Sequence, residues 1–285
     1  MEFGLFDHID RSDRPIAQQY DERLELIAAA DAAGFYAYHL SEHHATPIST
    51  VPAPSIFLGA VARQTKRIRL GPMVFLLPLS SPLRVIEEIC ILDHLSHGRL
   101  DVGVGRGSNP FEYAFNKLDF EQSEEIFADA LGALIEGLTH DRLTYAGPHY
   151  TFNEVPIPLA PLQRPHPPMW YGSTTSRSST WAGAQGLQFV TTAPAEAARS
   201  GLAAFTEALA KRGGAAVPSS VFSGGAAKGL VREVYVAESD AEARRIAKPA
   251  HDHLYHNQTY LRREHDGGRF SDLGITFRPT HRAGD

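Results

Sequence analysis

The feature that most constrains the fold is a repeat of about 33 residues, in which a short apolar run is followed by a segment with helical periodicity. The β-prone runs of this repeat begin near Glu2, Phe35, Ile68 and Leu100. Strands that alternate with helices predict a parallel sheet, because each crossover helix returns the chain to the edge from which it left. The regular spacing favours a TIM-type (β/α)8 barrel over an open sheet.

The second half of the chain continues this alternation but ends early. Three more strands are expected at 169–171, 187–192 and 230–237, the last followed by a helix that Ser239 or Asp240 would cap. No clear eighth strand and helix follow in the sequence. The last β/α unit is therefore not apparent, and the barrel is expected to be incomplete at its C-terminus.

We expect residues 1–285 to form a single domain. Two short β-prone runs around Gly147-Pro148 predict a small hairpin insertion near 143–152. From about residue 251 the sequence is rich in His, Arg and Tyr, and only the short run 274–277 is β-prone. This part is expected to be an irregular tail.

The composition argues against several classes of function. The net charge of −6 disfavours nucleic acid as the main partner, since a phosphate-binding surface needs a basic patch. No apolar run is long enough to cross a membrane, and the N-terminus does not resemble a signal peptide. We therefore expect no membrane partner and a cytoplasmic location. The single cysteine, Cys90, lies among apolar residues and is expected to be an inert buried thiol.

The most unusual polar residues follow the second predicted strand. Glu42, His43 and His44 come shortly after the aromatic run 35–38. Burying such groups is costly unless each is paired, so their position indicates a site rather than packing. The active sites of α/β barrels lie at the C-terminal ends of the strands, where these residues are expected. A polar loop with hydrogen-bonded histidines is the alternative.

A metal site is a second alternative for these histidines, with further ligands from Asp7 or His8. The sequence contains no H-E-x-x-H motif and no Cys-rich spacing. His251, His253 and His256 are close in sequence, but a solvated tail explains them better. We therefore predict no metal.

Residues 172–176, Gly-Ser-Thr-Thr-Ser, stand between the fifth strand and a helix and indicate an anion site. Backbone N–H groups and hydroxyls at the start of a helix can bind a phosphate, and the guanidinium of Arg106 matches the same group. Simple helix capping is the alternative. The run Gly103-x-Gly105-x-Gly107 is not the dinucleotide fingerprint, because its third glycine comes one residue too early. We expect these glycines to let a planar ligand approach the backbone.

Together these residues resemble the bacterial luciferase-like family of flavin-dependent monooxygenases, from Met1 to about Ser239. The segments that carry the resemblance stand in the order and at the spacing of the family. They are Phe3-Gly4, Ser41-Glu42-His43-His44, Leu92 to Arg99 running into Gly103 to Gly107, and Pro161 to Pro168.

The resemblance implies a barrel that binds reduced FMN (FMNH2), often delivered by a separate flavin reductase. In the family, reduced flavin reacts with O2 to give a C4a-hydroperoxide, which oxygenates an aldehyde, a ketone or a similar small organic substrate. The catalytic histidine falls on His43, as a base or as the group that stabilises the peroxyflavin, with Glu42 and His44 next in line. Family members commonly form homodimers through the second and third helices, here near 54–64 and 82–95.

The resemblance also implies which residues hold the cofactor. Arg106 matches the arginine that binds the FMN phosphate, and the phosphate-binding turn falls on Thr174, Thr175 and Ser178, next to Ser173 of the hydroxyl-rich run. A non-proline cis peptide under the flavin falls between Met73 and Val74. An apolar cavity is needed to keep water from the reactive flavin. Its candidate walls, which form the substrate pocket, are Phe6, Phe75, Leu77, Phe111, Tyr113 and Trp170.

Three other functions remain open on the sequence. The chain could be a flavin-binding accessory or storage protein without turnover. A related enzyme could use the deazaflavin F420 for hydride transfer on a similar barrel. A metal-dependent barrel hydrolase has the least support. The sequence does not predict the substrate, because the residues that select it would lie in loops where the family motifs are weakest.

Overall fold

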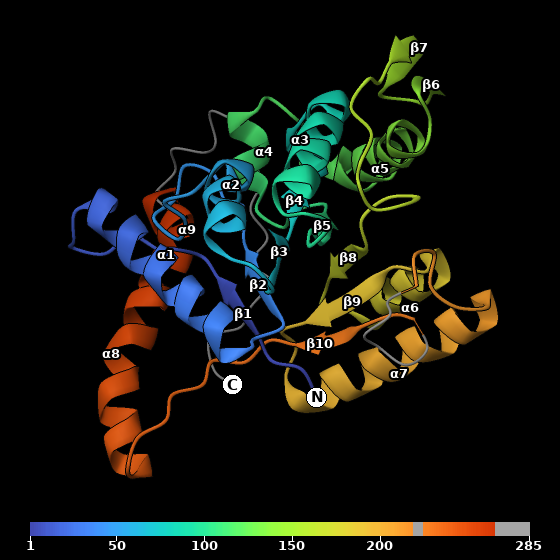
Figure 1. Cartoon of the computed structure of the whole chain (residues 1–285). Coiled ribbons are helices and arrows are strands. Elements are labelled where there is room, and N and C mark those ends of the chain that lie inside the picture. Colours follow the sequence, from blue (N-terminus) through green and yellow to red (C-terminus); the bar gives the residue numbers. More distant parts are fainter. Residues whose placement is uncertain (219–224, 266–285) are drawn as a thin grey trace.

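The computed structural model describes residues 1–218 and 225–265 (Figure 1). Its parallel strands are β1 (Gly4–Asp7), β2 (Ala37–Leu40), β3 (Arg69–Pro72), β4 (Phe75–Leu76), β5 (Val102–Gly105), β8 (Met169–Gly172), β9 (Gln188–Thr191) and β10 (Lys228–Leu230). They lie in the order β1-β2-β3 and β4-β5-β8-β9-β10, and a bridge between Leu70 and Leu100 joins the two sheets. This is the strand order of a TIM-type (β/α) barrel, as the repeat predicts.

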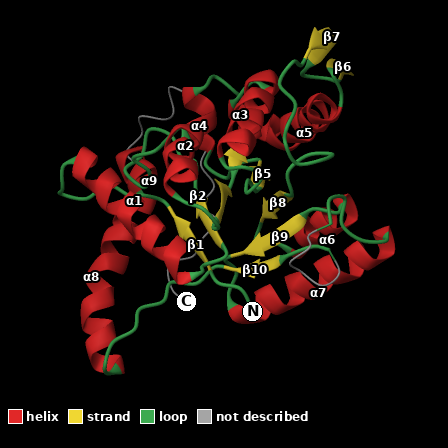
Figure 2. Cartoon of the chain, in the orientation of Figure 1, coloured by secondary structure: helices red, strands yellow, loops and turns green. Residues whose placement is uncertain are grey.

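The helices surround these strands (Figure 2). They are α1 (Ile16–Ala33), α2 (Pro54–Gln64), α3 (Pro82–Leu95), α4 (Pro110–Phe115), α5 (Ser123–Thr139), α6 (Ser176–Gln185), α7 (Ala195–Arg212), α8 (Asp240–Gln258) and α9 (Tyr260–His265), with single 3₁₀ turns at Leu77–Leu79 and Phe120–Gln122. Of the two predicted caps, Ser239 is the one that caps α8, by accepting a hydrogen bond from the Glu242 N–H. None of the helices in the described ranges is long and apolar enough to cross a membrane.

The main core lies between the first strands and the helices that cover them. Leu40, Leu70 and Val102 on the strands and Val61 and Ile86 on α2 and α3 are fully buried in one apolar cluster. Every residue of β5 is buried. Burial on both faces is what parallel strands between helices require, and it explains why these strands read as continuous apolar runs in the sequence.

The hairpin expected near 143–152 is present, with somewhat wider bounds. β6 (Arg142–Ala146) and β7 (Thr151–Pro156) pair antiparallel around the Gly147-Pro148 turn. It projects away from the barrel strands in Figure 1. The predicted third strand is interrupted at the Met73–Val74 peptide bond, which is cis as the resemblance implies.

The predicted strand at 230–237 is wrong over most of its length. β10 ends at Leu230, and the last sheet-like contact is the Val231 N–H bonded to the Thr191 carbonyl. Val234 and Val236 are 79% and 86% exposed, so the apolar pattern that predicts a strand is not buried here. Residues 231–237 instead run as an extended connection to α8.

The irregular tail expected from about 251 is helical as far as His265. Helix α8 continues to Gln258 because its side chains bond to the loop after β1: Asn257 Nδ2 donates to Asp10 Oδ2 at 3.0 Å, and His253 Nε2 lies 2.7 Å from the Arg11 carbonyl oxygen. The β-prone run 274–277 lies outside the described residues.

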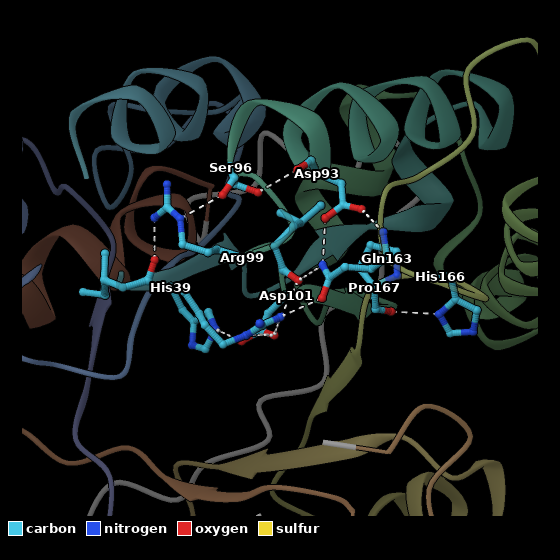
Figure 3. Close-up of polar contacts among 11 residues, drawn as sticks. His39, Asp93, Ser96, Arg99, Asp101, Gln163, His166 and Pro167 are labelled. Atoms are coloured by element: carbon cyan, nitrogen blue, oxygen red, sulfur yellow. Dashed lines mark hydrogen bonds and ion pairs between the residues drawn. The ribbon is translucent and has the colours of Figure 1, made fainter. Parts of the chain in front are cut away.

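Two segments that carry the family resemblance meet in a polar network at the amino-terminal ends of β3 and β5 (Figure 3). Asp93, which is fully buried, accepts hydrogen bonds from the backbone N–H and the side-chain amide of Gln163, both at 2.7 Å. The Arg99 guanidinium donates to the carbonyls of Ala62, Thr65 and Ile68. These bonds tie α2, α3 and the 161–168 segment to the barrel.

A buried ion pair completes this network. Asp101 bonds to Arg69 Nε at 2.8 Å and lies 3.3 Å from His39 Nε2. Burial would raise the pKa of the Asp101 carboxyl, but Arg69 and His39 together hold it below its ordinary value. The network belongs to the end of the barrel where side chains serve stability.

Candidate active site

A cavity of about 960 Å³ opens at the carboxyl ends of the strands, the face where α/β barrels carry their active sites. Its volume is at the upper end of the roughly 300–1,000 Å³ range of cofactor and small-molecule sites. The structure brings most of the predicted site residues to its wall. They are Phe6, Glu42, His43, Met73, Val74, Arg106, Ser173, Thr174, Thr175 and Ser178.

One end of the cavity is built around His43, which follows β2. His43 Nδ1 lies 3.4 Å from Oε1 of Glu112, a carboxylate whose side chain is only 2% exposed. The same oxygen accepts a 2.8 Å hydrogen bond from the backbone N–H of His44. On the other side, the rings of His43 and His8 are 5.7 Å apart. His8 Nδ1 in turn lies 2.7 Å from Ser41 Oγ.

Glu42 and His44 pair with each other rather than with His43. Glu42 Oε1 lies 2.9 Å from His44 Nε2, and its second oxygen accepts from the Leu76 N–H at 3.3 Å. Burial raises the pKa of the Glu42 carboxyl, and the hydrogen bond to His44 offsets part of that effect. The same hydrogen bond raises the pKa of His44. His44 is not on the cavity wall, so its side chain supports Glu42 from outside the cavity.

Among the histidines at this end of the cavity, His8 has the most strongly shifted pKa. Burial, followed by the charge of His43, lowers the pKa of His8 from 6.5 to about 4. His8 is therefore neutral at neutral pH, and its contact with Ser41 does not involve a positive charge.

The other end of the cavity is the turn between β8 and α6. Thr175 caps α6: its hydroxyl oxygen accepts from the Ser178 N–H at 3.3 Å, and its hydroxyl bonds to Ser178 Oγ at 2.9 Å. The Ser173 hydroxyl accepts from the Thr175 N–H at 3.3 Å. Helix capping, the alternative interpretation of this run, is therefore present, and the same hydroxyls also line the cavity.

Arg106 extends from the end of β5 into the same wall. Its Nη1 donates to Ser123 Oγ at 2.8 Å, and its guanidinium lies 5.1 Å from the centre of the Phe120 ring. Burial raises the pKa of Tyr171, while the Ser178 hydroxyl and the Arg106 charge act in the opposite direction. Arg106, Tyr171 and Ser178 all line the cavity, and together they form one polar corner of its wall.

The glycines of β5 and of the loop that follows it allow a close approach between backbone segments. A Cβ at Gly103 would lie 2.4 Å from the Pro72 carbonyl oxygen, and a Cβ at Gly105 would lie 2.3 Å from Val74 Cγ2. Gly103 and Gly105 allow β5 to pack against the β3–β4 segment, and Gly105 and Gly107 also line the cavity. Gly107 has φ +81°, a conformation that favours glycine.

Several predicted walls of the substrate pocket do not face the cavity. Phe75, Leu77, Phe111, Tyr113 and Trp170 are all buried, but none of them lines it. Phe75 and Leu77 belong to the main core, and Phe111 packs against Leu261. Trp170 packs with Met73 inside the barrel. The apolar wall consists instead of Phe6, Met73, Val74, Leu76, Phe127, Trp181, Val190 and Val231.

The sequence did not single out Glu112, Tyr171 or Arg177 for the site. Glu112 lies on α4, a helix that Asn109 caps by accepting from the Phe111 N–H, with Pro110 at its first position. An Asn-Pro pair before an apolar segment is a recognisable start signal for a helix, and it could have predicted α4. His8 was noted at the end of the first strand but only as a possible metal ligand.

In the described ranges, no group of three or more His, Cys, Asp or Glu side chains is arranged to hold a metal ion. Glu42, His43 and His44 therefore take part in pairwise contacts with neighbours rather than in one ligand set.

Curated relatives share the sequence over much of its length. The protein y4wF of Sinorhizobium fredii is 40% identical over 259 residues, which cover 91% of this chain and 74% of that protein. The oxygenase component of the flavin-dependent trigonelline monooxygenase of Acinetobacter baylyi is 32% identical over 186 residues, which cover 64% of this chain and 51% of that protein. The chain thus spans about half the length of several curated relatives that it matches.

Solved structures share the fold. The monooxygenase RslO1 of Streptomyces bottropensis has a TM-score of 0.82 at 25% identity, covering 91% of this chain and 79% of that one. The oxygenating constituent of the 3,6-diketocamphane monooxygenase of Pseudomonas putida, solved with FMN, has a TM-score of 0.77 at 22% identity. The match covers 97% of this chain and 80% of that one. An F420-dependent secondary alcohol dehydrogenase has a TM-score of 0.63 at 18% identity, and the match covers 74% of this chain and 64% of that one.

The model of the luciferase-like monooxygenase family matches residues 1–283. The match spans the barrel strands, the cavity and the polar network at the opposite end of the barrel. The resemblance found in the sequence motifs is confirmed: the chain belongs to the luciferase-like monooxygenase family.

Proposed function

We propose that the chain is an FMN-dependent monooxygenase, which uses reduced FMN and O2 to oxygenate a small organic substrate such as an aldehyde or a ketone. The observation that carries this proposal is a single cavity with two chemically different ends. Arg106 and the hydroxyl-rich start of α6 form one end, and His43 forms the other. The family and the flavin-dependent trigonelline relative support the choice of a flavin.

The residues present fit a flavin mononucleotide. A phosphate needs a cation and several N–H or O–H donors, and Arg106, Ser173, Thr174, Thr175 and Ser178 offer them at one end of the cavity. The FMN-bound structure with the same fold supports FMN over a larger dinucleotide. Tyr171, which lines the same corner, adds a further hydroxyl to it.

The flat faces of a flavin ring pack against apolar side chains, and Met73, Val74, Leu76 and Val190 supply such side chains on the cavity wall. When bound, reduced FMN supplies the electrons that activate O2. The apolar side chains exclude water from the space over the ring. His43 accepts or holds a proton at the ring nitrogen that faces away from Glu112.

Two partners belong to this proposal. The trigonelline relative is named as the oxygenase component of a monooxygenase, which supports a separate flavin reductase as the source of reduced FMN. A second copy of the chain is the other proposed partner. Ile56 on α2 and Ile91 on α3 are 79% and 48% exposed, and a homodimer through these two helices would cover them.

The proposal is tested by titrating the purified chain with FMN and, under nitrogen, with reduced FMN, and then admitting O2 with and without an aldehyde or ketone. Flavin fluorescence reports binding, and an oxygen electrode with a peroxide assay reports the fate of O2. We expect reduced FMN to bind and the substrate to lower the fraction of O2 released as H2O2. The variant His43→Ala should bind FMN but lose this coupling.

Two results would redirect the proposal. If reduced FMN binds but all O2 appears as H2O2 whatever substrate is added, the chain is better described as a flavin-binding accessory or storage protein. If FMN does not bind and reduced F420 is oxidised by a carbonyl substrate without O2, the function is hydride transfer. The F420-dependent neighbour has the same fold, so that outcome needs its own measurement.

A further inference from the structure

Glu112 is a buried carboxylate that the proposed function does not yet use. It lines the cavity from α4, and its side chain is 2% exposed. Its Oε1 has two neighbours, the backbone N–H of His44 at 2.8 Å and Nδ1 of His43 at 3.4 Å. One oxygen atom of Glu112 therefore faces both the loop that carries the histidines and the ring of the first histidine.

The charge of Glu112 requires a partner. A carboxylate is costly to bury unless hydrogen bonds or an opposite charge compensate for lost hydration. In residues 1–218 and 225–265, the only ion pair of Glu112 is the one with His43. An ionised carboxylate only accepts hydrogen bonds, so Nδ1 can approach it favourably only when Nδ1 carries a hydrogen.

The other groups around His43 are occupied. Glu42 and His44, its neighbours in the chain, pair with each other at 2.9 Å. His8, which faces His43 from β1, bonds to Ser41 and is neutral, because burial lowers its pKa to about 4. Glu112 on α4 is the charged group left to set the state of the His43 ring.

We propose that Glu112 is a positioning residue that holds His43 in the tautomer with hydrogen on Nδ1, which leaves Nε2 as the basic nitrogen for the cavity. The backbone contact to His44 fixes Glu112 and His43 relative to each other. In this arrangement Glu112 also stabilises the positive charge that His43 gains when Nε2 takes up a proton. The role in turnover rests on the proposed function, whereas the tautomer is a property of the chain alone.

The tautomer is measured directly by two-bond ¹H–¹⁵N NMR of the full chain with ¹⁵N-labelled histidine and no flavin, at a pH of about 8.5, where imidazoles with ordinary pKa values are neutral. His43→Gln identifies the His43 signals by their loss. We expect the wild-type pattern to show hydrogen on Nδ1. Glu112→Ala should change it to a mixture in which the form with hydrogen on Nε2 predominates.

Two variants separate this role from general damage to the site. Glu112→Gln keeps an oxygen for the His44 N–H, so it preserves the loop if Glu112→Ala fails to fold. Glu124→Ala removes another carboxylate of the cavity wall, one paired with Arg177 at 3.5 Å, and should leave the His43 signals unchanged. Hydrogen on Nε2 of His43 in the wild type, or an unchanged pattern in Glu112→Ala, would overturn the proposal.

Turnover provides the second measurement once flavin binding is established. Glu112→Gln should lower kcat by roughly 10- to 100-fold, a fraction of what a general base contributes, and leave the Kd for FMN within about twofold. Failure of FMN to bind any form of the chain would contradict the proposed function and leave the tautomer result intact. Glu112→Gln keeps the oxygen but removes the charge, so an unchanged kcat in this variant would contradict the proposed stabilisation of the His43 charge even if FMN binds.

Discussion

Arg106 is the residue of the cavity wall that we propose as the cation for the FMN phosphate. Its guanidinium is held by Ser123 and by the Phe120 ring, and it lies on the same wall as the hydroxyls of the α6 turn. We expect Arg106→Ala to weaken FMN binding by roughly 1.5–3 kcal/mol, the usual contribution of a hydrogen bond to a charged group. A fluorescence titration measures this as an increase in Kd of about 10- to 150-fold.

Arg177 is the matched control for Arg106. It also lines the cavity, but its side chain is 88% exposed and already pairs with Glu124. Exposed arginines contribute less to an anion site, because water screens their charge. Arg177→Ala should therefore weaken FMN binding less than Arg106→Ala, and an equal effect of both would contradict the specific role of Arg106.

His8 gives a prediction about stability. Its pKa is about 4 in the folded chain and 6.5 in the unfolded chain, so between these values the unfolded chain takes up the proton more readily. Stability contributed by the neutral ring is complete above pH 6.5 and is lost as the pH falls towards 4. The total effect is about 3 kcal/mol, from 1.36 kcal/mol for each pKa unit.

Urea unfolding at several pH values measures this loss. His8→Asn keeps a polar group near Ser41 but does not titrate, so its unfolding free energy should fall less between pH 6.5 and 4 than that of the wild type. Parallel curves for the two proteins would mean that His8 is not the group responsible.

At the residue scale, the sequence predicts a site residue correctly when its position just after a strand is enough to place it at the cavity. His43 and Arg106 follow predicted strands, so the rule that barrels use strand ends places them correctly on the cavity wall. Glu112 depends on α4 folding back on the loop after β2, 68 positions away from His44. Phe75 is predicted as a wall of the substrate pocket, but its side chain faces the core. Neighbouring residues of a strand point to opposite sides of the sheet, so closeness in sequence to a cavity residue is not enough.

At the scale of elements, the segment 92–99 is one of those that carry the family resemblance, and it lies at the end of the barrel away from the cavity (Figure 3). Asp93 on α3 is fully buried and bonds twice to Gln163, which itself donates to the Leu100 carbonyl (Figure 3). Such a motif identifies a family through its architecture. It does not show where the chemistry takes place.

We expect Asp93→Ala to lower the free energy of unfolding by about 3 kcal/mol, because two charge-assisted hydrogen bonds to the half-buried Gln163 are lost. The midpoint of urea unfolding measures the change. Glu87→Ala, an exposed carboxylate on the same helix, should alter it by less than about 0.5 kcal/mol. At temperatures where Asp93→Ala is folded, its FMN affinity should equal that of the wild type; a weaker affinity would mean that the network also shapes the cavity.

Helices and strands are predicted correctly where the hydrophobic periodicity and the capping residues indicate the same element. Helices α1, α2 and α3 and their strands follow the 33-residue repeat. The segment 231–237 has a strand pattern, yet a strand also needs a neighbour with which to pair, and that information is not local. Helix α8 extends beyond the predicted region because His253 and Asn257 find partners in the loop after β1.

At the scale of the whole molecule, the barrel separates two tasks along its axis. The amino-terminal ends of β3 and β5 hold the buried Asp101–Arg69 pair and the Asp93 network, while the carboxyl ends of all the described barrel strands meet at the cavity. The repeat predicts the position of the cavity, because parallel strands place all their carboxyl ends on one face. The polar network at the opposite end is seen only in the structure. The substrate is selected by loop side chains, whose arrangement no repeat specifies.

The outer surface of the molecule leads to a prediction about assembly. Ile56 on α2 and Ile91 on α3 are large apolar residues with exposed side chains, on two helices that pack together through contacts such as Ser55 to Glu88. We expect the chain to be a dimer through this face at micromolar concentration, since covering both residues on each protomer removes apolar area from water. Sedimentation velocity measures the mass.

The double variant Ile56→Glu and Ile91→Glu should convert this dimer to a monomer, because closing the interface would bury unpaired carboxylates. Val236→Glu is the control, since Val236 is 86% exposed but lies on the connection to α8, away from α2 and α3. If both variants dissociate the dimer, the interface includes the connection; if neither does, it lies on another face. A wild-type chain that sediments as a monomer would mean that the exposed isoleucines of α2 and α3 remain in contact with water.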